Sequence, residues 1–413
     1  MVLIIKQMAM KRIGIVVMAL MLAVLAASSA QICEYAGTSL PYPGHGDREA
    51  YQVPDSLEVV YIDHVGRHGA RFLSKASYTR DMLKFLDDAG PLTPAGVRLR
   101  ALCHSLDSVT AGHYGALDSI GMVEQTGIGD RMSRRGAEAL RQLDSVTAIA
   151  SYVPRCVMSM DICSHAVIWN HPETEMRQGS GPRYNRLVRF FDTDSAYIAY
   201  DRSNEWKRVW EAYDAKVSPV DAVRRLVSDS GQISDKKLRN MARVMYKIVA
   251  GANAVFGDVD WRAFYTPQEY RRAWQSENLR HYLTYSANGL SLTPSRMSRG
   301  LVADIAASLE RALRTGYDGP AMTLRFGHAE TLMPLLSQLA VPGCRYVTTD
   351  WDRVAEHWHD YEVVPMAANL QLLLLRSKGS DRMYVQTLHN EQPAMPLMTY
   401  RQAQEWLDQS LTR

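Results

Sequence analysis

Three apolar runs, each suited to a strand buried on both faces, limit what this chain can fold into. They are LEVVYID at 57–63, RCVMSMD at 155–161 and AMTLRFG at 321–327. Continuous apolar runs separated by helical patterns are typical of a sheet whose two faces are covered by helices. The sequence therefore predicts an α/β core.

Helical periodicity fills most of the intervening chain. Between the first two runs it predicts helices at 75–89, 94–109 and 132–150, the last with Ser133 as its N-cap. Near the C-terminus it predicts helices at 299–316 and from 330, a hairpin-like pair at 369–377 and 382–389, and an amphipathic helix in RQAQEWLDQSLT.

Residues 166–299 differ from the rest of the chain because they contain no convincing strand pattern. Successive helical patterns occur there at 203–214, 218–228, 234–256 and 267–284. We expect a helical cap at 166–299, inserted into a core formed by 31–165 and 300–413. The insertion holds 21 Lys and Arg against 15 Asp and Glu. A net-positive lid suits an anionic ligand, although long arginine-rich surface helices explain the charge equally well.

The first thirty residues have the layout of a secretory signal peptide. Lys11 and Arg12 precede an apolar run at 13–27, and Ser28, Ser29 and Ala30 supply small residues for cleavage. We expect export to the periplasm, the medium or the cell surface. The alternative is a retained anchor, but the run is shorter than the roughly 20 residues that a spanning helix needs, so no stable membrane insertion is expected.

Charge and cysteine content exclude several functions. Cleavage would lower the count of Lys and Arg from 47 to 44 and leave the 44 Asp and Glu unchanged, and such a balance argues against nucleic acid as the main partner. An exported chain with five cysteines allows one or two disulfides. The sequence contains no CxxC pair, which argues against redox catalysis and against a zinc knuckle.

The first apolar run ends in Arg67, His68, Gly69 and Arg71. Ligands of open α/β sheets bind at the carboxyl ends of strands. Two arginines there can hold a tetrahedral oxyanion with forked hydrogen bonds, and a neutral histidine between them can attack phosphorus. The alternative is a capped strand end with surface arginines.

The third run repeats this layout, with Gly327, His328 and then Glu330 in the first turn of a helix. If the two strands are neighbours, His328 becomes a phosphate donor and Glu330 can protonate the leaving oxygen. The helix N-terminus would lower the pKa of Glu330, whereas burial beside an anionic phosphate would raise it.

The segment HWHD at 357–360 suggests a metal site, but its place in a charged helical stretch favours a structural role. We expect no metal and no cofactor.

RHGAR at 67–71 and HAET at 328–331, set around a helical insertion, resemble the histidine phosphatase superfamily in its acid phosphatase and phytase branch. His-Ala-Glu is similar to the multiple inositol polyphosphate phosphatases, whereas most members of that branch carry His-Asp. Further similar segments are LTPAG (92–96), PRCVMSM (154–160), MSRRGAEAL (132–140), LVRFFD (187–192) and LHNEQ (388–392).

The resemblance implies a role for each matching residue. His68 would be the nucleophile, Glu330 the proton donor, and the phosphate cradle would consist of Arg67, Arg71, Arg155 and His328. Lys75 falls at a substrate-contacting lysine of phytases, although Leu73 and Ser74 replace the proline and threonine of their pattern. Arg177, Arg183 and Arg189 are further candidates for peripheral phosphates, with surface salt bridges as the alternative.

The leading hypothesis is an exported phosphomonoesterase that hydrolyses inositol polyphosphates, including inositol hexakisphosphate, through a phosphohistidine. The alternatives are a general acid or sugar phosphatase and, from another class, a non-catalytic relative that binds polyanions.

Overall fold

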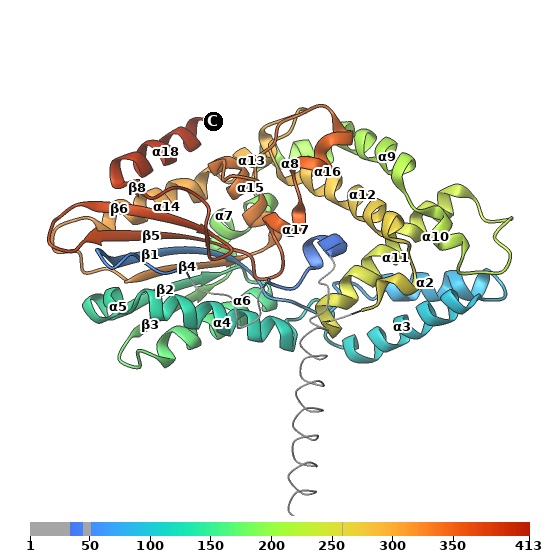
Figure 1. Cartoon of the computed structure of the whole chain (residues 1–413), viewed down its shortest axis with the longest axis horizontal. Helices are drawn as coiled ribbons and strands as arrows, with labels where there is room; N and C mark the ends of the chain where they lie inside the picture. Colours follow the sequence, from blue (N-terminus) through green and yellow to red (C-terminus); the bar gives the residue numbers. More distant parts are fainter. Residues whose placement is uncertain (1–33, 44–50, 258) are drawn as a thin grey trace, which may run out of the picture. The chain divides into compact units, whose positions relative to one another are not determined.

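A mixed sheet of eight strands organises the described part of the chain. The structure is a computed structural model that describes residues 34–43, 51–257 and 259–413 (Figure 1), and residues 35–413 form one unit. The predicted signal peptide and Cys33 lie outside the described residues. The strands run in the order β3-β2-β4-β1-β5-β6-β7, and β8 pairs with β6. Their bounds are β1 Leu57–Arg67, β2 Ser145–Ala150, β3 Glu175–Ser180, β4 Met322–Gly327, β5 Asn369–Ser377, β6 Met383–His389, β7 Gln392–Pro393 and β8 Met398–Thr399.

Two of the three predicted strands, β1 and β4, are confirmed and are parallel neighbours at the centre of the sheet. Their register pairs Arg67 with Gly327, so that both strands end at the same edge. The predicted hairpin is confirmed as β5 and β6, which are antiparallel. The fold is therefore α/β, as expected.

The prediction of a strand at 155–161 was wrong, because this segment lies in the helix α6 (Pro154–Trp169). Pro154 occupies the first helical turn, where the missing N–H costs nothing. Cys156, Ser159, Met160 and Cys163 are buried at helical spacing. The strand that follows β1 along the chain is instead β2, in the segment SVTAIA.

The predicted helix at 132–150 was also wrong. The segment contains the end of α4 (Ser119–Arg135), then α5 (Ala137–Leu143) and β2. Ser133 is not an N-cap, because it lies inside α4 and its buried Oγ donates to the carbonyl of Val167 at 3.1 Å. Asp144 adopts a left-handed conformation, with φ of 40°, and ends α5 directly before β2.

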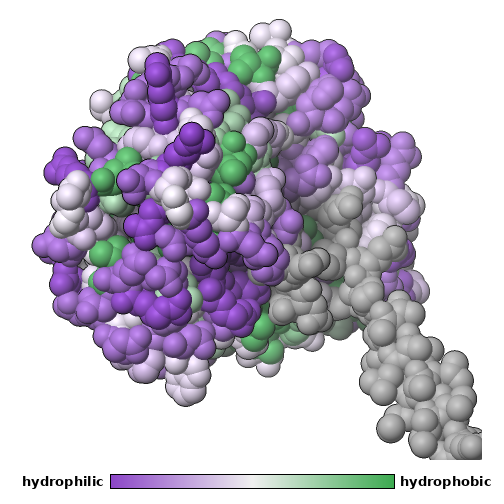
Figure 2. All heavy atoms as spheres, turned by 60° about the vertical axis from the view of Figure 1, so that its left-hand side comes forward, coloured by the Kyte–Doolittle hydropathy of each residue, from purple (hydrophilic) through white to green (hydrophobic). Residues whose placement is uncertain are grey.

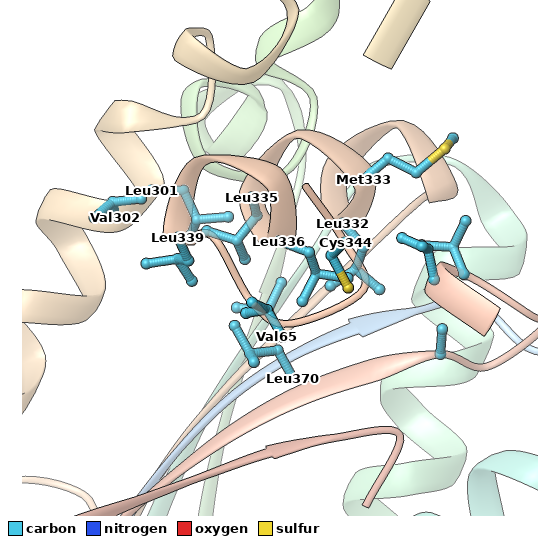
Figure 3. Close-up of a cluster of buried hydrophobic side chains, with 14 of the residues drawn as sticks. Val65, Leu301, Val302, Leu332, Met333, Leu335, Leu336, Leu339, Cys344 and Leu370 are labelled. Atoms are coloured by element: carbon cyan, nitrogen blue, oxygen red, sulfur yellow. The ribbon is translucent and has the colours of Figure 1, made fainter. Parts of the chain in front are cut away.

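Helices cover both faces of the sheet (Figure 1). On one side lie α4, α5 and α6, and on the other α14 (Arg299–Ala312), α15 (Ala329–Leu339) and α18 (Tyr400–Thr412). Each face has its own apolar core, one around Ile62 and Leu324 and the other around Val65 and Leu370. Figure 3 shows Val65 and Leu370 below leucines of α15. Leucine-rich packing on α15 thus fixes the helix that begins directly after His328.

The middle of the chain is mainly helical. The predicted helices there are confirmed as α9 (Glu205–Val217), α10 (Val220–Arg224), α11 (Asp235–Phe256) and α12 (Pro267–Tyr285). The remaining helices are α2 Ser77–Asp88, α3 Pro94–Thr110, α7 Asn185–Val188, α8 Ser195–Arg202, α13 Thr293–Arg296, α16 Val354–His357 and α17 Asp360–Val363, with 3-10 turns at Glu34–Ser39, Pro182–Tyr184, Phe190–Asp192, Trp261–Ala263 and Trp351–Arg353.

One strand, β3, interrupts this helical region, contrary to the expectation for 166–299. Its sequence EMRQGS is mostly exposed and pairs in parallel with β2 at the sheet edge. An edge strand with both faces polar has no apolar alternation, which explains why the sequence pattern missed it.

Cys103, Cys156, Cys163 and Cys344 are buried free thiols, so the disulfides that the cysteine count allows do not form among these four residues. No helix within the described ranges has the length and apolar character needed to cross a membrane. On the face drawn in Figure 2, hydrophobic residues form small separate patches among hydrophilic ones.

Candidate active site

The two histidines of the strand-end motifs meet at the carboxyl edge of β1 and β4. The ring centroids of His68 and His328 lie 5.7 Å apart, with the rings edge to face. The parallel register of β1 and β4 explains this proximity, because each histidine directly follows the last paired residue of its strand.

The backbone of the turn after β1 is held on every side. The N–H of His68 donates to the carbonyl of Gly327 at 3.1 Å, and its carbonyl accepts from the N–H of Ala367 at 3.1 Å. The N–H of Gly69 donates to Oγ of Ser159 at 3.1 Å. Buried backbone groups without partners are costly, so these bonds fix the turn in one conformation.

Close packing, rather than a special backbone angle, requires glycine at position 69. A Cβ on Gly69 would lie 2.6 Å from the carbonyl oxygen of Gly121, and a Cβ on Gly121 would lie 2.2 Å from that of Ala70. The φ angle of Gly69 is not positive. The turn brings a backbone carbonyl to the imidazole, since Nδ1 of His68 lies 2.9 Å from the carbonyl oxygen of Gly69.

That contact defines the chemical state of His68. A carbonyl oxygen only accepts, so the ring proton resides on Nδ1 and Nε2 keeps its lone pair. Burial lowers the pKa of His68 well below its ordinary value, and the positive charges of Arg155, Arg67 and Arg71 lower it further. His68 is therefore a neutral imidazole on the wall of a cavity.

Three arginines line the same cavity. Arg67 is oriented by two carbonyls, those of Thr38 and Val364, which both accept from its Nη1 at 2.7 Å. Nη1 of Arg71 donates to the carbonyl of Phe72 at 3.0 Å. The Nε–H groups of Arg67, Arg71 and Arg155 are buried and donate to no acceptor among the residues that the structure describes. Burial lowers the pKa of both Arg67 and Arg71 from the usual range.

Arg155 reaches the site from the first turn of α6, not from a strand. Its Nη2 lies 3.3 Å from Nδ1 of His328. Arg155 still approaches His68 because α6 begins shortly after β2, whose end is at the same sheet edge as β1 and β4.

His328 is beside the cavity and is not among its lining residues. Its Nε2 lies 3.0 Å from Oγ of Ser151 and 3.1 Å from Nη1 of Arg189. Arg189 is also paired with Asp192. Burial lowers the pKa of His328 to about 3, an effect that Glu330 opposes and Arg155 reinforces.

Glu330 stands in the first turn of α15 and lines the cavity. Burial raises its pKa, but His328, its own backbone N–H, Arg67 and Arg155 together outweigh burial and lower it below the ordinary value. The pKa of Glu330 is therefore lowered by the protein's own groups, as expected for the first turn of a helix, and burial alone does not raise it.

The cavity encloses about 220 Å³ and has a strongly cationic lining. Lys247 of α11 and Arg280 of α12 add to the three arginines, and Glu330 is the one carboxylate among the lining residues that the structure describes. Lys247 and Arg280 both pair with the buried Glu277. Sequence reasoning missed these two cations. For Arg280 the signal was Glu277, Arg280 and His281 at i, i+3 and i+4 on one helix, and this spacing does not include Lys247.

The remaining candidates lie outside the cavity lining. Lys75 is exposed, and its neighbour Ser74 lines the cavity instead. Arg177 pairs with Glu175 at 2.7 Å on the exposed strand β3. Arg183 stacks over the ring of Tyr184 at 4.6 Å.

The HWHD segment is used for packing. Asp360 is buried and accepts from Nε1 of Trp274 at 2.9 Å and from the ring of His281 at 2.7 Å. In the part of the chain that the structure describes, no three His, Cys, Asp or Glu side chains are grouped to hold a metal ion.

Solved structures share this fold at low sequence identity. A Bifidobacterium longum multiple inositol polyphosphate phosphatase, in complex with inositol hexasulfate, has a TM-score of 0.72 and 15% identity over 88% of this chain and 93% of that one. For the phytase from D. castellii the values are 0.70 and 15% over 92% and 85%. For a Hafnia alvei phytase in complex with tartrate they are 0.52 and 12% over 87% and 98%.

A family model, that of the histidine phosphatase superfamily (branch 2), matches residues 186–390. The match includes His328 and Glu330, and it begins after the turn that carries His68. That turn nevertheless supplies Arg67, His68 and Arg71 to the lining of the cavity beside α15. With this sequence match and the shared fold, the chain belongs to branch 2 of the histidine phosphatase superfamily.

Proposed function

We propose that this chain is a phosphomonoesterase that hydrolyses inositol polyphosphates, including inositol hexakisphosphate, through a phosphohistidine on His68. The observation that carries the proposal is the group of three buried Nε–H donors, on Arg67, Arg71 and Arg155, around a neutral imidazole. Buried donors without protein acceptors call for a ligand, and guanidinium forks match the oxygens of a phosphate.

In the first half of the reaction, the lone pair of Nε2 on His68 attacks phosphorus. A P–N bond forms while the bond from phosphorus to the leaving ester oxygen breaks, and protonated Glu330 gives its proton to that oxygen. The arginines bind the oxygens on which charge is carried in the transition state. A dianionic phosphate on the same arginines would raise the pKa of Glu330 from its lowered value, which favours the acid form.

In the second half, water attacks phosphorus and Glu330, now a carboxylate, takes its proton. The P–N bond breaks, its electron pair returns to Nε2, and inorganic phosphate leaves. His68 keeps its Nδ1 proton throughout, because the carbonyl oxygen of Gly69 continues to accept the hydrogen bond from Nδ1–H.

The proposed substrate class rests on the second group of cations. Lys247 and Arg280 line the side of the cavity formed by α11 and α12, within the proposed cap at 166–299. A simple phosphomonoester has one phosphate for the arginines around His68, whereas an inositol polyphosphate has further phosphates for these two cations. Inositol hexasulfate in the Bifidobacterium longum enzyme supports the same class.

Export remains part of the proposal. The features of residues 1–30 support a cleaved signal peptide, and hence a periplasmic, secreted or surface location.

The test is phosphate release from inositol hexakisphosphate by protein without residues 1–30, in the presence of a chelator, with His68→Ala as the matched inactive variant. We expect steady release by the wild type and almost none by the variant. A panel of sugar phosphates and simple aryl phosphates separates this activity from a general phosphatase, which would turn over all of them equally well. Binding of inositol hexakisphosphate without any release would identify a non-catalytic polyanion binder.

A further inference from the structure

The buried carboxylate of Glu124 has no part in the mechanism above, yet it lies one peptide group away from His68. Glu124 is on α4 and is only 2% exposed. Its Oε2 accepts from the N–H of Ala70 at 2.6 Å, and its Oε1 accepts from the N–H of Tyr42 at 2.7 Å. Burial of an ionised carboxylate is costly, and these two donors only partly compensate, since burial raises the pKa of Glu124 to about 7.

The N–H that Glu124 binds and the carbonyl that His68 binds belong to the same amide. The peptide group between Gly69 and Ala70 donates its N–H to Glu124 and accepts Nδ1–H of His68 at its oxygen, at 2.9 Å. Hydrogen bonds in series polarise one another, most strongly where water is excluded. Negative charge beside the N–H of Ala70 increases the electron density on the carbonyl oxygen of Gly69. This strengthens the hydrogen bond that the oxygen accepts from Nδ1–H of His68.

We propose that Glu124 is a positioning residue that acts on His68 through the Gly69–Ala70 peptide group. The carboxylate holds that peptide in orientation and keeps the ring proton of His68 on Nδ1, so that Nε2 faces phosphorus with its lone pair. When phosphorus bonds to Nε2 the ring becomes cationic, and the polarised carbonyl stabilises that charge. No proton moves along the chain of bonds. The effect requires the ionised form of Glu124, which a pKa of about 7 makes the major form above that pH, so the variants below are compared with wild type above pH 7. A catalytic triad orients its histidine with a carboxylate in direct contact. Here an amide stands between the two groups.

The same carboxylate also fixes a second part of the site. Tyr42 follows the short segment whose Thr38 carbonyl orients Arg67. The carbonyl of Ala70 is held in turn by the N–H of Asp118, at 3.1 Å, at the start of α4. Asp118 and Arg67 are the charged groups that act on Glu124, the first raising and the second lowering its pKa. Substitution of Glu124 therefore acts first on the turn with the nucleophile, and only through Tyr42 on Arg67.

The test compares Glu124→Gln with wild type. The amide has the same shape, but it carries no charge and presents an NH₂ group to one of the two N–H donors. The kinetic part of this test rests on the proposed function, because it requires turnover. We expect kcat to fall about tenfold or more for both hexakisphosphate and a small aryl phosphate, with KM changed by less than about threefold. A KM that rises while kcat stays constant would overturn the proposal.

A spectroscopic arm does not depend on turnover. In protein with ¹⁵N-labelled histidine, the His68 signals, assigned by their loss in His68→Gln, should show the Nδ1–H tautomer in wild type. In Glu124→Gln they should shift toward a weaker Nδ1–H hydrogen bond. Gln125→Ala is the matched control, because Gln125 binds the carbonyl of Arg67 in the same turn, at 3.0 Å, without touching the amide. It should leave the His68 signals at their wild-type positions.

The outcomes separate the two proposals. If the wild type releases no phosphate from any ester, the proposed function fails while the tautomer measurement still stands. If wild-type His68 carries its proton on Nε2, or if Glu124→Gln leaves both the His68 signals and kcat unchanged, the role of Glu124 is overturned. Should Glu124→Gln not fold, a wild-type proton on Nε2 of His68 would still overturn the role of Glu124.

Discussion

The ring of His68 meets the ring of His328 edge to face, with 5.7 Å between their centroids. The two residues come from distant parts of the sequence, and the parallel register of β1 and β4 joins them. Burial and neighbouring positive charge keep both rings neutral. A site with this geometry makes several definite predictions.

The close approach of α4 to the turn after β1 predicts that Gly121→Ala is destabilising. The new Cβ would lie 2.2 Å from the carbonyl oxygen of Ala70 and 2.7 Å from its nitrogen, and neither backbone atom can move freely. We expect a loss of about 1–3 kcal/mol in the free energy of unfolding, measured in urea, together with lower kcat. Gly300→Ala on α14 is the control, since its nearest neighbour lies at 3.9 Å. Equal stability of the two variants would contradict this packing.

Lys247 and Arg280 should affect affinity for highly phosphorylated substrates only. For Lys247→Ala or Arg280→Ala we expect the KM for hexakisphosphate to rise about tenfold, as for the loss of one charge-assisted hydrogen bond. The kcat/KM for a small aryl phosphate should stay within about twofold. Lys236→Ala is the control, because Lys236 is exposed on α11, the helix that carries Lys247. A parallel loss on both substrates would mean that these cations serve the reacting phosphate itself.

Glu330→Gln should slow substrates according to their leaving group. An inositol oxygen needs a proton in order to leave, so we expect kcat for hexakisphosphate to fall about 100-fold or more. A nitrophenolate leaves without a proton, so p-nitrophenyl phosphate should lose far less. The two rates are compared in one enzyme preparation. Equal losses on both substrates would exclude Glu330 as the proton donor.

The lowered pKa of His68 predicts how the site responds to acid. The neutral ring is the nucleophile, and a depressed pKa keeps it neutral below about 6.5, where an ordinary histidine becomes charged. The ¹⁵N signals of His68 should therefore remain those of a neutral ring, with no protonation of Nε2, as the pH falls from 7.5 to 5.5. A titration midpoint near that of an unfolded peptide would contradict the assigned environment.

Much of this fold could be predicted from the sequence, because the central strands are buried on both faces. The apolar runs that became β1 and β4 were predicted as core strands, and each is followed by polar residues of the site. Arg155 was assigned to the site although its segment is a helix. A parallel strand that began at Arg155 would have placed it at the opposite edge of the sheet, whereas the start of α6 follows the end of β2 at the carboxyl edge and brings the side chain to the site.

Other parts of the site depend on packing that no local pattern records. Lys247 and Arg280 reach the cavity only because α11 and α12 cross over it and share Glu277. Glu124 sits at a buried position of α4, where an apolar residue would be expected, and its partners are backbone groups distant in sequence. Arg189 was expected at peripheral phosphates, and its contact with His328 follows from the docking of the 185–192 segment beside β4.

The central claim is that phosphorus is transferred to His68, and the most direct test is to trap the intermediate. Radiolabelled hexakisphosphate is mixed with enzyme, the reaction is quenched in alkali within milliseconds, and the digested peptides are analysed for label. We expect acid-labile label on the peptide that contains His68, and none with His68→Ala. Rapid phosphate release with no label on His68, or full turnover by His68→Ala, would contradict it.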